Sequence, residues 1–304
     1  MATPRSQLID PHRALHYHLV SRCVRRSWLC GRDPLTHKSY QHRKQWLEDR
    51  LHLLVKCFSV SLQAYAIMSN HFHLVVKFDP LAVQQWSDEE VAERWHTAFP
   101  PKHQGEVLED LKALKIECMI DNPDRLAAAR LTLGSLSLFM KALKQPVALR
   151  ANREDGCKGH FFEQRFFSGA LLNEAALIAT MAYVDLNPIR AKIAQSLGEC
   201  QHTSMAERLK DIDQFPERLH QVMTPLVSGI EPSAIPPELS ITLADYQQLL
   251  NRHIEAEITK KPSRWWAQVA SIKRRQKAYG SIEQLKTWAQ QRGQQWIQAN
   301  PLSE

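Results

Sequence analysis

Residues 59–78, SVSLQAYAIMSNHFHLVVKF, decide the fold of this 304-residue chain. The runs 59–68 (SVSLQAYAIM) and 71–78 (HFHLVVKF) are rich in apolar, β-branched and aromatic residues, and the polar pair Ser69-Asn70 separates them. Two such runs joined by a two-residue polar turn are typical of a β-hairpin. Because side chains alternate along a strand, His71 and His73 are expected on one face and Phe72 on the other.

The segments on either side of the hairpin extend it into a sheet with helices. Apolar patterning predicts strands over 15–24 and 161–172 and helices over 39–58 and 131–150. We expect the second helix to break near Pro146, because proline removes a helical hydrogen bond. The order strand, helix, strand, strand, helix, strand is the split βαβ plan. We therefore predict an α+β protein with a ferredoxin-like βαββαβ antiparallel sheet, in which the strand of His71 is central.

Three further regions surround this core. Residues 81–130 are charged and mostly helical in pattern, residues 215–240 contain five prolines, and helical periodicity returns from Leu243. We predict a main domain over 1–214 with a helical insertion over 81–130. A proline-containing linker over 215–240 and a basic helical C-terminal region over 241–304 would follow.

Charge and composition narrow the class of protein. The formal charge is +7, and residues 1–60 carry eleven Lys/Arg against four Asp/Glu, while residues 251–296 carry ten against three. Two basic ends are compatible with nucleic acid. The six cysteines form no C-x-x-C pair, which argues against a zinc knuckle or a disulfide framework. Without a long apolar run or a secretory leader, we expect a cytoplasmic protein with no membrane partner.

The histidine pair is the first candidate for chemistry. His71 and His73 lie two residues apart on the predicted strand, roughly 6.5–7 Å along the chain, so both imidazoles could turn onto one metal ion. The same pattern also fits ordinary polar alternation on a half-exposed strand. The pair alone leaves both interpretations open.

A second motif lies on the helix that follows the last predicted strand. It reads Tyr183-Val184-Asp185-Leu186-Asn187-Pro188-Ile189-Arg190. Tyr183 and Asn187 are four residues apart and share one face of a helix, so they can approach the metal site together. Tyr183 could equally be a packed aromatic residue, and Asn187 could cap the helix that Pro188 opens.

Together these motifs resemble a known family. The hairpin segment 66–76 (AIMSNHFHLVV) and the segment 183–190 (YVDLNPIR) resemble the HUH single-strand endonucleases, in the form found in the REP-associated tyrosine transposases of bacteria. The segments 139–145 (FMKALKQ) and 159–166 (GHFFEQRF) are similar to corresponding family segments, and the resemblance covers about residues 14–205.

The resemblance implies an HUH endonuclease core and a DNA transposase activity. The protein would cleave and rejoin single-stranded DNA carrying REP-type hairpins through a 5′-phosphotyrosine intermediate. Tyr183 would be the nucleophile, and His71, His73 and Asn187 would hold the metal. Two imidazoles and an amide leave positions open for phosphate and water, and we expect Mg²⁺, with Mn²⁺ as a substitute.

Basic residues near these motifs are the candidates for DNA contact. They are Arg22, Arg25, Arg26, Lys141, Lys144, Arg165 and Arg190. In the tail, Trp265-Trp266 and Lys273-Arg274-Arg275 could stack bases and neutralise phosphates, although tryptophans at helical spacing are more often core. The expected partner is hairpin-containing single-stranded DNA, bound by a nucleoid-associated monomer or homodimer. The alternatives are a non-catalytic hairpin-binding protein on the same fold and a metal-dependent phosphodiesterase that uses activated water.

Overall fold

A six-stranded sheet forms the centre of the protein, in the order β7-β2-β3-β1-β6-β8. The computed structural model describes residues 4–24, 30–33, 37–163, 165–230, 239–259 and 264–294. The strands are β1 (Leu15–Arg22), β2 (Val60–Ile67), β3 (His71–Phe78), β6 (Phe167–Leu171), β7 (Val227–Ser228) and β8 (Ala278–Tyr279). The inner four are antiparallel with β3 between β2 and β1, which confirms the βαββαβ plan. Since β8 pairs parallel to β6, the complete sheet is mixed.

The hairpin sets the register that positions the site. The N–H of Met68 donates to the carbonyl of His71 at 2.8 Å, which closes the turn at Ser69-Asn70. On β1, Arg22 pairs with His71 and Val20 pairs with His73. Directly paired residues project to the same face of a sheet. Arg22 therefore shares the face of both histidines.

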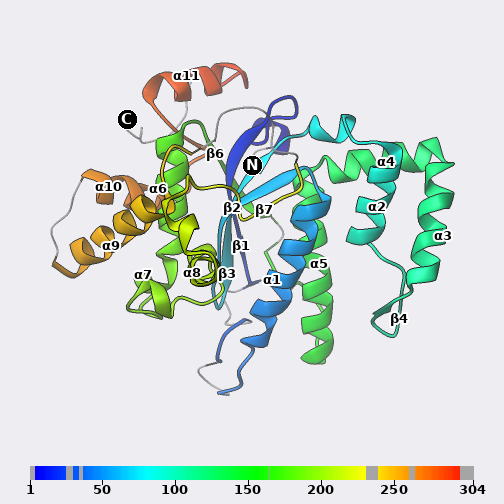
Figure 1. The fold of residues 1–304 in the computed structure, drawn as a ribbon, viewed down its shortest axis with the longest axis horizontal. Coiled ribbons are helices and arrows are strands. Elements are labelled where there is room, and N and C mark those ends of the chain that lie inside the picture. The colour runs from blue at the N-terminus through cyan, green and yellow to red at the C-terminus, as the bar shows by residue number, and fades with distance from the viewer. Residues whose placement is uncertain are drawn as a thin grey trace.

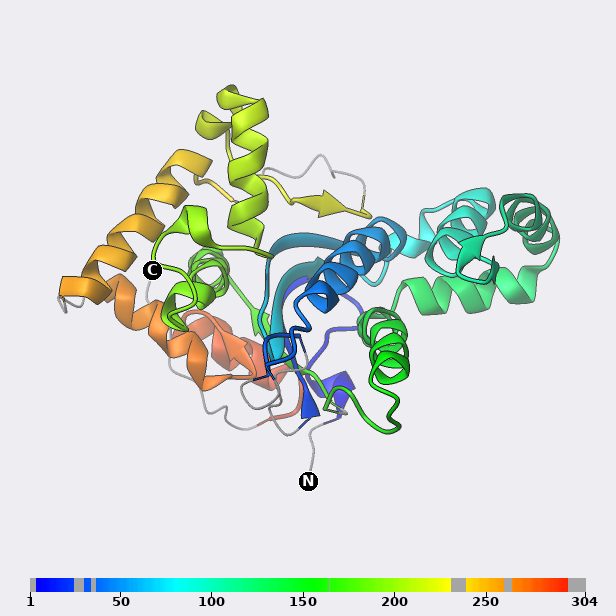
Figure 2. The same ribbon diagram turned by 90° about the horizontal axis from the view of Figure 1, so that it is seen from below.

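Helices cover both faces of the sheet, and the buried side chains differ between the two faces. Helices α1 (His42–Cys57) and α5 (Leu136–Glu154) lie on one face, and α6 (Glu174–Asp185) lies on the other (Figures 1 and 2). The α1/α5 face buries large apolar side chains, among them Phe72 and Phe139. The α6 face has a separate apolar cluster, built mainly of Leu, Ala, Val and Met side chains around Val75.

The break in the second long helix is not at Pro146. Helix α4 (Pro123–Leu133) ends at Gly134, and Ser135 caps α5 by accepting a hydrogen bond from the N–H of Leu138. Pro146 lies within α5. Because proline has no backbone N–H, the carbonyl of Ala142 lacks the helical hydrogen bond that it would otherwise accept from residue 146. Nε of Arg50 donates to that carbonyl at 3.4 Å. A tertiary contact thus replaces the lost helical bond, and the predicted break was wrong.

The insertion forms a lobe beside α1, on the far side of the sheet from α6 (Figure 1). It consists of α2 (Asp88–Ala98), the short hairpin of β4 (Lys102–His103) and β5 (Glu106–Val107), α3 (Glu109–Ile120) and α4. Val91, Met119 and Leu126 join this lobe to the larger apolar core.

The C-terminal region is helical, and its first two helices pack on the α6 side of the sheet (Figures 1 and 2). Leu285 and Trp288 of its last helix join the larger apolar core. After α7 (Asn187–Arg190), α8 (Ser204–Gln214) and β7, it comprises α9 (Leu243–Thr259), α10 (Arg264–Ser271), β8 and α11 (Ile282–Gln290). Tyr246, Val269 and Ile272 are buried in the same cluster as α6, and Trp265 packs against it. The tail therefore contributes to the core as well as basic charge.

Two bulk expectations can be set beside the structure. All six cysteines are free thiols. No single helix in the described ranges has the length and hydropathy of a membrane span, and α4 and α5 reach it only jointly, across an 85° bend.

Candidate active site

His71 and His73 lie at the start of β3 and face α6. His73 is only 2% exposed and His71 is half-buried. Their ring centroids are 4.9 Å apart, with the rings nearly perpendicular. Strand alternation thus brings both imidazoles to one place, beneath the C-terminal end of α6.

Each histidine has its Nδ1 atom engaged within the protein. Nδ1–H of His71 donates to Oδ1 of Asn70 at 2.6 Å. Nδ1 of His73 lies 2.9 Å from Nε2 of His18, a β1 residue that is 1% exposed. In the tautomer in which His73 donates to His18, Nε2 of both His71 and His73 is left with its lone pair. Metal-binding histidines are commonly oriented in this way, by a hydrogen bond at the other ring nitrogen.

Burial keeps these imidazoles neutral. Desolvation, followed by the charges of Arg22 and Arg275, lowers the pKa of His71 to about 4. Desolvation also lowers the pKa of His73 well below its ordinary value and that of His18 to about 3. A neutral imidazole is the form that binds metal. The pair is therefore ready to act as a ligand at neutral pH.

Tyr183 and Asn187 reach the histidine pair from the other side. The Tyr183 ring centroid is 5.5 Å from that of His73 and 6.0 Å from that of His18. A hydrogen bond between the Asn187 side chain and His71 partly offsets the lowered pKa of that histidine. The N-cap position of α7 is occupied by Leu186, not by Asn187, and α7 has no side-chain capping bond. The capping interpretation of Asn187 was therefore wrong.

A buried carboxylate fixes the end of α6 that carries the tyrosine. Asp185 accepts hydrogen bonds from the hydroxyl of Ser204 and from the N–H of Met205, both on α8, and from the hydroxyl of Tyr246 on α9. Burial raises the pKa of Asp185, against the effect of these bonds. Since Tyr183 is two residues away, this network holds the tyrosine in position.

The basic residues expected to contact DNA separate into two groups. Arg22 lies opposite His71, and Arg190 stacks on the Tyr183 ring with Cζ 4.9 Å from its centroid. Lys141 and Lys144 belong to α5 on the opposite face, where Lys144 donates to the carbonyl of Glu163 at 3.2 Å.

The side chain of Arg165 is exposed. The pKa of the neighbouring Arg5 is lowered to about 10, first because Arg5 is partly buried and second because of the positive charge of Arg165. Arg25 and Arg26 lie outside the described residues. Among the members of the expected set that the structure describes, only Arg22 and Arg190 are thus placed at the histidine and tyrosine site.

The donor set fits an open divalent-metal site. Within the described ranges, no group of three or more His, Cys, Asp or Glu side chains is arranged to hold a metal ion. If a metal binds here, His71 and His73 with the amide oxygen of Asn187 would be the protein ligands, and the remaining positions would go to water or phosphate. Such a site suits Mn²⁺ and Mg²⁺ better than the closed, tetrahedral sites of structural zinc.

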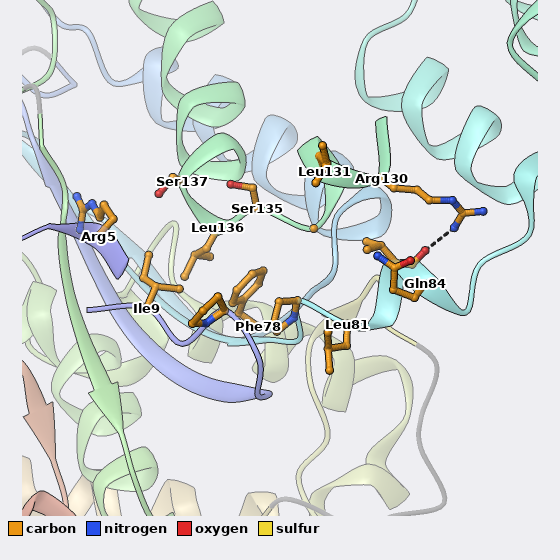
Figure 3. A pocket seen from close by; sticks show the side chains of 14 residues that line it. Arg5, Ile9, Phe78, Leu81, Gln84, Arg130, Leu131, Ser135, Leu136 and Ser137 are labelled. Atoms are coloured by element: carbon orange, nitrogen blue, oxygen red, sulfur yellow. Dashed lines mark hydrogen bonds between the residues drawn. The ribbon is translucent and has the colours of Figure 1, made fainter. Parts of the chain in front are cut away.

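The site is separate from the cavity drawn in Figure 3. That cavity, of about 370 Å³, lies at the turn between α4 and α5 on the opposite face. Ile9, Phe78 and Leu136 form part of its apolar wall, with Arg5 at one end and Arg130 at the other. Nothing in it connects to the histidine pair.

Two residues at the site were not identified from the sequence. His18 is part of a second His-x-His, His16-Tyr17-His18 on β1, and this alternation was a signal that could have drawn attention to it. Arg275 was noted only as one charge of a basic tail. Its position beside His71 depends on where the tail folds back, which no local pattern gives.

Comparison with known proteins gives a weak likeness. No family model and no curated protein matches the chain. A solved structure of a REP-associated tyrosine transposase bound to a REP hairpin is similar at a TM-score of 0.36 and 11% identity, covering 79% of this chain and 99% of that one. A likeness of this size supports no conclusion about chemistry.

Proposed function

We propose that this protein is a metal-dependent single-stranded DNA endonuclease and transposase that cuts and rejoins DNA through Tyr183. The observation that carries the proposal is the convergence of four side chains on one face of the sheet. Neutral His71 and His73 lie beside the Tyr183 ring, and Asn187 hydrogen-bonds to His71. A nucleophile placed next to a metal-ligand pair is the arrangement that phosphoryl transfer requires.

The reaction is a transfer between two oxygens. The Tyr183 oxygen attacks the scissile phosphorus, the bond from phosphorus to the 3′ oxygen breaks, and the phenolic proton reaches the 3′ oxygen through solvent. The products are a 5′-phosphotyrosine and a free 3′ hydroxyl. Because the phosphodiester energy is retained, the 3′ hydroxyl can attack in reverse and rejoin the strand without ATP.

Metal and arginines would assist at defined places. A free phenol has a pKa of about 10 and is a poor nucleophile at neutral pH. Mg²⁺ or Mn²⁺, held by His71, His73 and Asn187, would polarise the phosphate. Arg190, stacked on the Tyr183 ring, would orient that ring and offer a charge to the same phosphate.

The substrate class is the one that the family resemblance implies. We infer single-stranded DNA carrying hairpins of the REP type, acted on by a cytoplasmic, nucleoid-associated enzyme. The scissile phosphate must approach Tyr183 and the buried histidine pair together, which regular duplex opposes. Duplex DNA is therefore expected to be a poor substrate.

The test is formation of a covalent adduct. The protein is incubated with a fluorescent single-stranded hairpin oligonucleotide and Mn²⁺, then run on a denaturing gel, with the attachment site mapped by mass spectrometry. We expect an adduct at Tyr183 that Tyr183→Phe abolishes without loss of fold. Tyr40→Phe, a change to a half-buried tyrosine stacked on Arg43 beside α1, is the matched control and should form the adduct normally.

Four other outcomes would contradict the proposal. An adduct at Tyr17, Tyr65 or Tyr279, or cutting by Tyr183→Phe, would remove the assigned nucleophile. Binding without any adduct would favour the hairpin-binding protein. Cut product with no protein attached would favour hydrolysis by activated water.

A further inference from the structure

We propose that Arg275 of the C-terminal region joins Arg22 to form a binding site for the scissile phosphate, so that the tail completes the active site. This inference rests on the proposed function and adds a residue to it. The site would take a phosphodiester anion, held between two guanidinium groups on the α6 face of the sheet.

The tail is joined to the core strand next to the site. Strand β8 pairs parallel to β6, with the N–H of Ala170 donating to Lys277 and that of Leu172 donating to Tyr279, both at 2.9 Å. Gly169 of β6 leaves room for this approach, because a Cβ there would lie 2.7 Å from the carbonyl oxygen of Gln276. The core strand is thus shaped to receive the backbone that directly follows Arg275.

The backbone of Arg275 is held in an unusual conformation. Its φ of 54° and ψ of 59° are left-handed, which costs a residue other than glycine roughly 1 kcal/mol or more. The N–H of Arg275 donates to Ile272 at 3.2 Å. The Tyr279 hydroxyl accepts from the N–H of Gln276 at 2.9 Å and lies 3.3 Å from the Ile272 carbonyl. These bonds fix the turn on both sides and so set the direction of the arginine.

The guanidinium group lies among the proposed catalytic residues. Cζ of Arg275 is 5.9 Å from the centroid of Phe167, whose ring meets that of His18 edge-on at 5.8 Å. The charge of Arg275 contributes to lowering the pKa of His71, and the Tyr183 hydroxyl in turn acts on Arg275. Arg275 is therefore close to both the metal ligands and the nucleophile.

Arg22 brings a second positive charge to the same place. It lies across from His71, and its Nε is buried without a hydrogen-bond partner in the described part of the chain. Neither Arg22 nor Arg275 pairs with a carboxylate among the described residues. Glu163, which is exposed, acts on Arg275 only from a distance. Two half-buried guanidinium groups without a carboxylate repel each other, and a phosphate between them removes the repulsion and accepts their hydrogen bonds.

The experiment compares Arg275→Gln with Arg274→Ala in the full-length protein. Arg274 belongs to the same basic run, but its side chain is exposed and none of the described contacts places it at the histidine and tyrosine site, so it serves as the matched control. With the fluorescent hairpin oligonucleotide at saturation and Mn²⁺, we expect Arg275→Gln to slow single-turnover adduct formation about 100-fold, the effect typical of losing one donor to a transition-state charge. In EDTA, its binding should lose about one unit of salt slope. Arg274→Ala should change adduct formation less than about threefold, as expected for a peripheral contact.

Further variants distinguish the possible failures. Arg275→Lys keeps the positive charge but loses the planar guanidinium geometry, and it should recover part of the rate of adduct formation. If the substitutions acted only through loss of fold, Arg275→Gln and Arg275→Lys would show the same lowered Tm. Wild-type rates and salt slope in a folded Arg275→Gln would overturn the phosphate site. If Tyr183→Phe also cuts, the proposed function fails instead, and the salt slope still decides whether Arg275 binds phosphate.

Discussion

Neighbouring residues of one strand serve opposite faces of the sheet. Phe72 and His73 are equally buried, each 2% exposed, yet Phe72 packs in the apolar core of α1 and α5 while His73 faces α6. On the first face, burial removes apolar surface from water and stabilises the fold. On the second, burial removes water from imidazoles and so prepares them as ligands. The same degree of burial therefore has different consequences, depending on the chemistry of the side chain.

The two faces also treat their histidines differently. On the α1 side, Nε2 of His52 lies 3.2 Å from a Glu207 oxygen, and this bond raises the pKa of His52. On the α6 side, burial and nearby arginines lower the pKa of His71 to about 4. A carboxylate keeps a histidine protonated, whereas desolvation and positive charge keep it neutral. Under the proposed function, the α6 face would hold the metal and the phosphate, while the α1 face contributes to stability.

The largest difference between the faces should appear in catalysis. His71→Ala or His73→Ala should lower metal-dependent cleavage by at least about 10³-fold, because metal polarisation of the phosphate is worth several kcal/mol. DNA binding in EDTA should remain nearly intact. Removing the metal from the wild-type protein with a chelator should lower cleavage by a similar factor. The same chelator should lower cleavage by the variants no further. Full activity in either variant would remove the metal assignment.

A substitution in the α1/α5 face should mainly lower the stability of the fold. Phe72→Ala removes a buried ring from the α1/α5 core and should lower the free energy of unfolding by about 3–5 kcal/mol. Denaturant unfolding measures this loss. Below the transition, the folded fraction should bind metal as wild type does. A loss under about 1 kcal/mol would mean that the face relaxes around the cavity.

The pH should act on the histidine face in the metal-free protein. The folded pKa of His71 is lowered to about 4 and that of His18 to about 3, from an ordinary 6.5, so the unfolded chain binds protons first as pH falls. Their contribution is present above about pH 6.5 and is lost as pH falls below it, by at most about 1.4 kcal/mol per pH unit for each histidine. Unfolding in EDTA between pH 7 and 5 measures this. The free energy of unfolding of His18→Gln should fall less steeply as the pH is lowered. The same slope in this variant and in wild type would contradict the prediction.

The smallest expected differences concern the basic residues. Arg22→Ala or Arg190→Ala should weaken binding of the hairpin oligonucleotide by about tenfold, and each should reduce the salt slope by about one. Lys141→Ala, on α5, should change binding less than about threefold, as for a peripheral contact. Fluorescence anisotropy at several salt concentrations makes the comparison. A larger effect of Lys141 would mean that DNA also follows the α1/α5 face.

Truncation near residue 240 is a poor way to test the tail. It would remove Tyr246, whose hydroxyl binds Asp185 beside the tyrosine, together with buried Val269 and Ile272. The fold of α6 would suffer along with any DNA contact. Point variants such as Arg275→Gln separate the two effects, because they leave the core in place.

Local sequence patterns were enough to predict the hairpin, the strand order, and the shared face of His71 and His73, because these follow from alternation and turn chemistry within short segments. They also predicted that Tyr183 and Asn187 approach the site together, although the structure places Tyr183 on α6 and Asn187 at the start of α7, not on one helix. Three contacts became visible only in the folded chain: His18 beside His73, Arg50 at the α5 carbonyl opposite Pro146, and Arg275 of the tail near the ring of Phe167. Each of these contacts joins segments distant in the chain. Their partners depend on register and packing, which local periodicity does not specify.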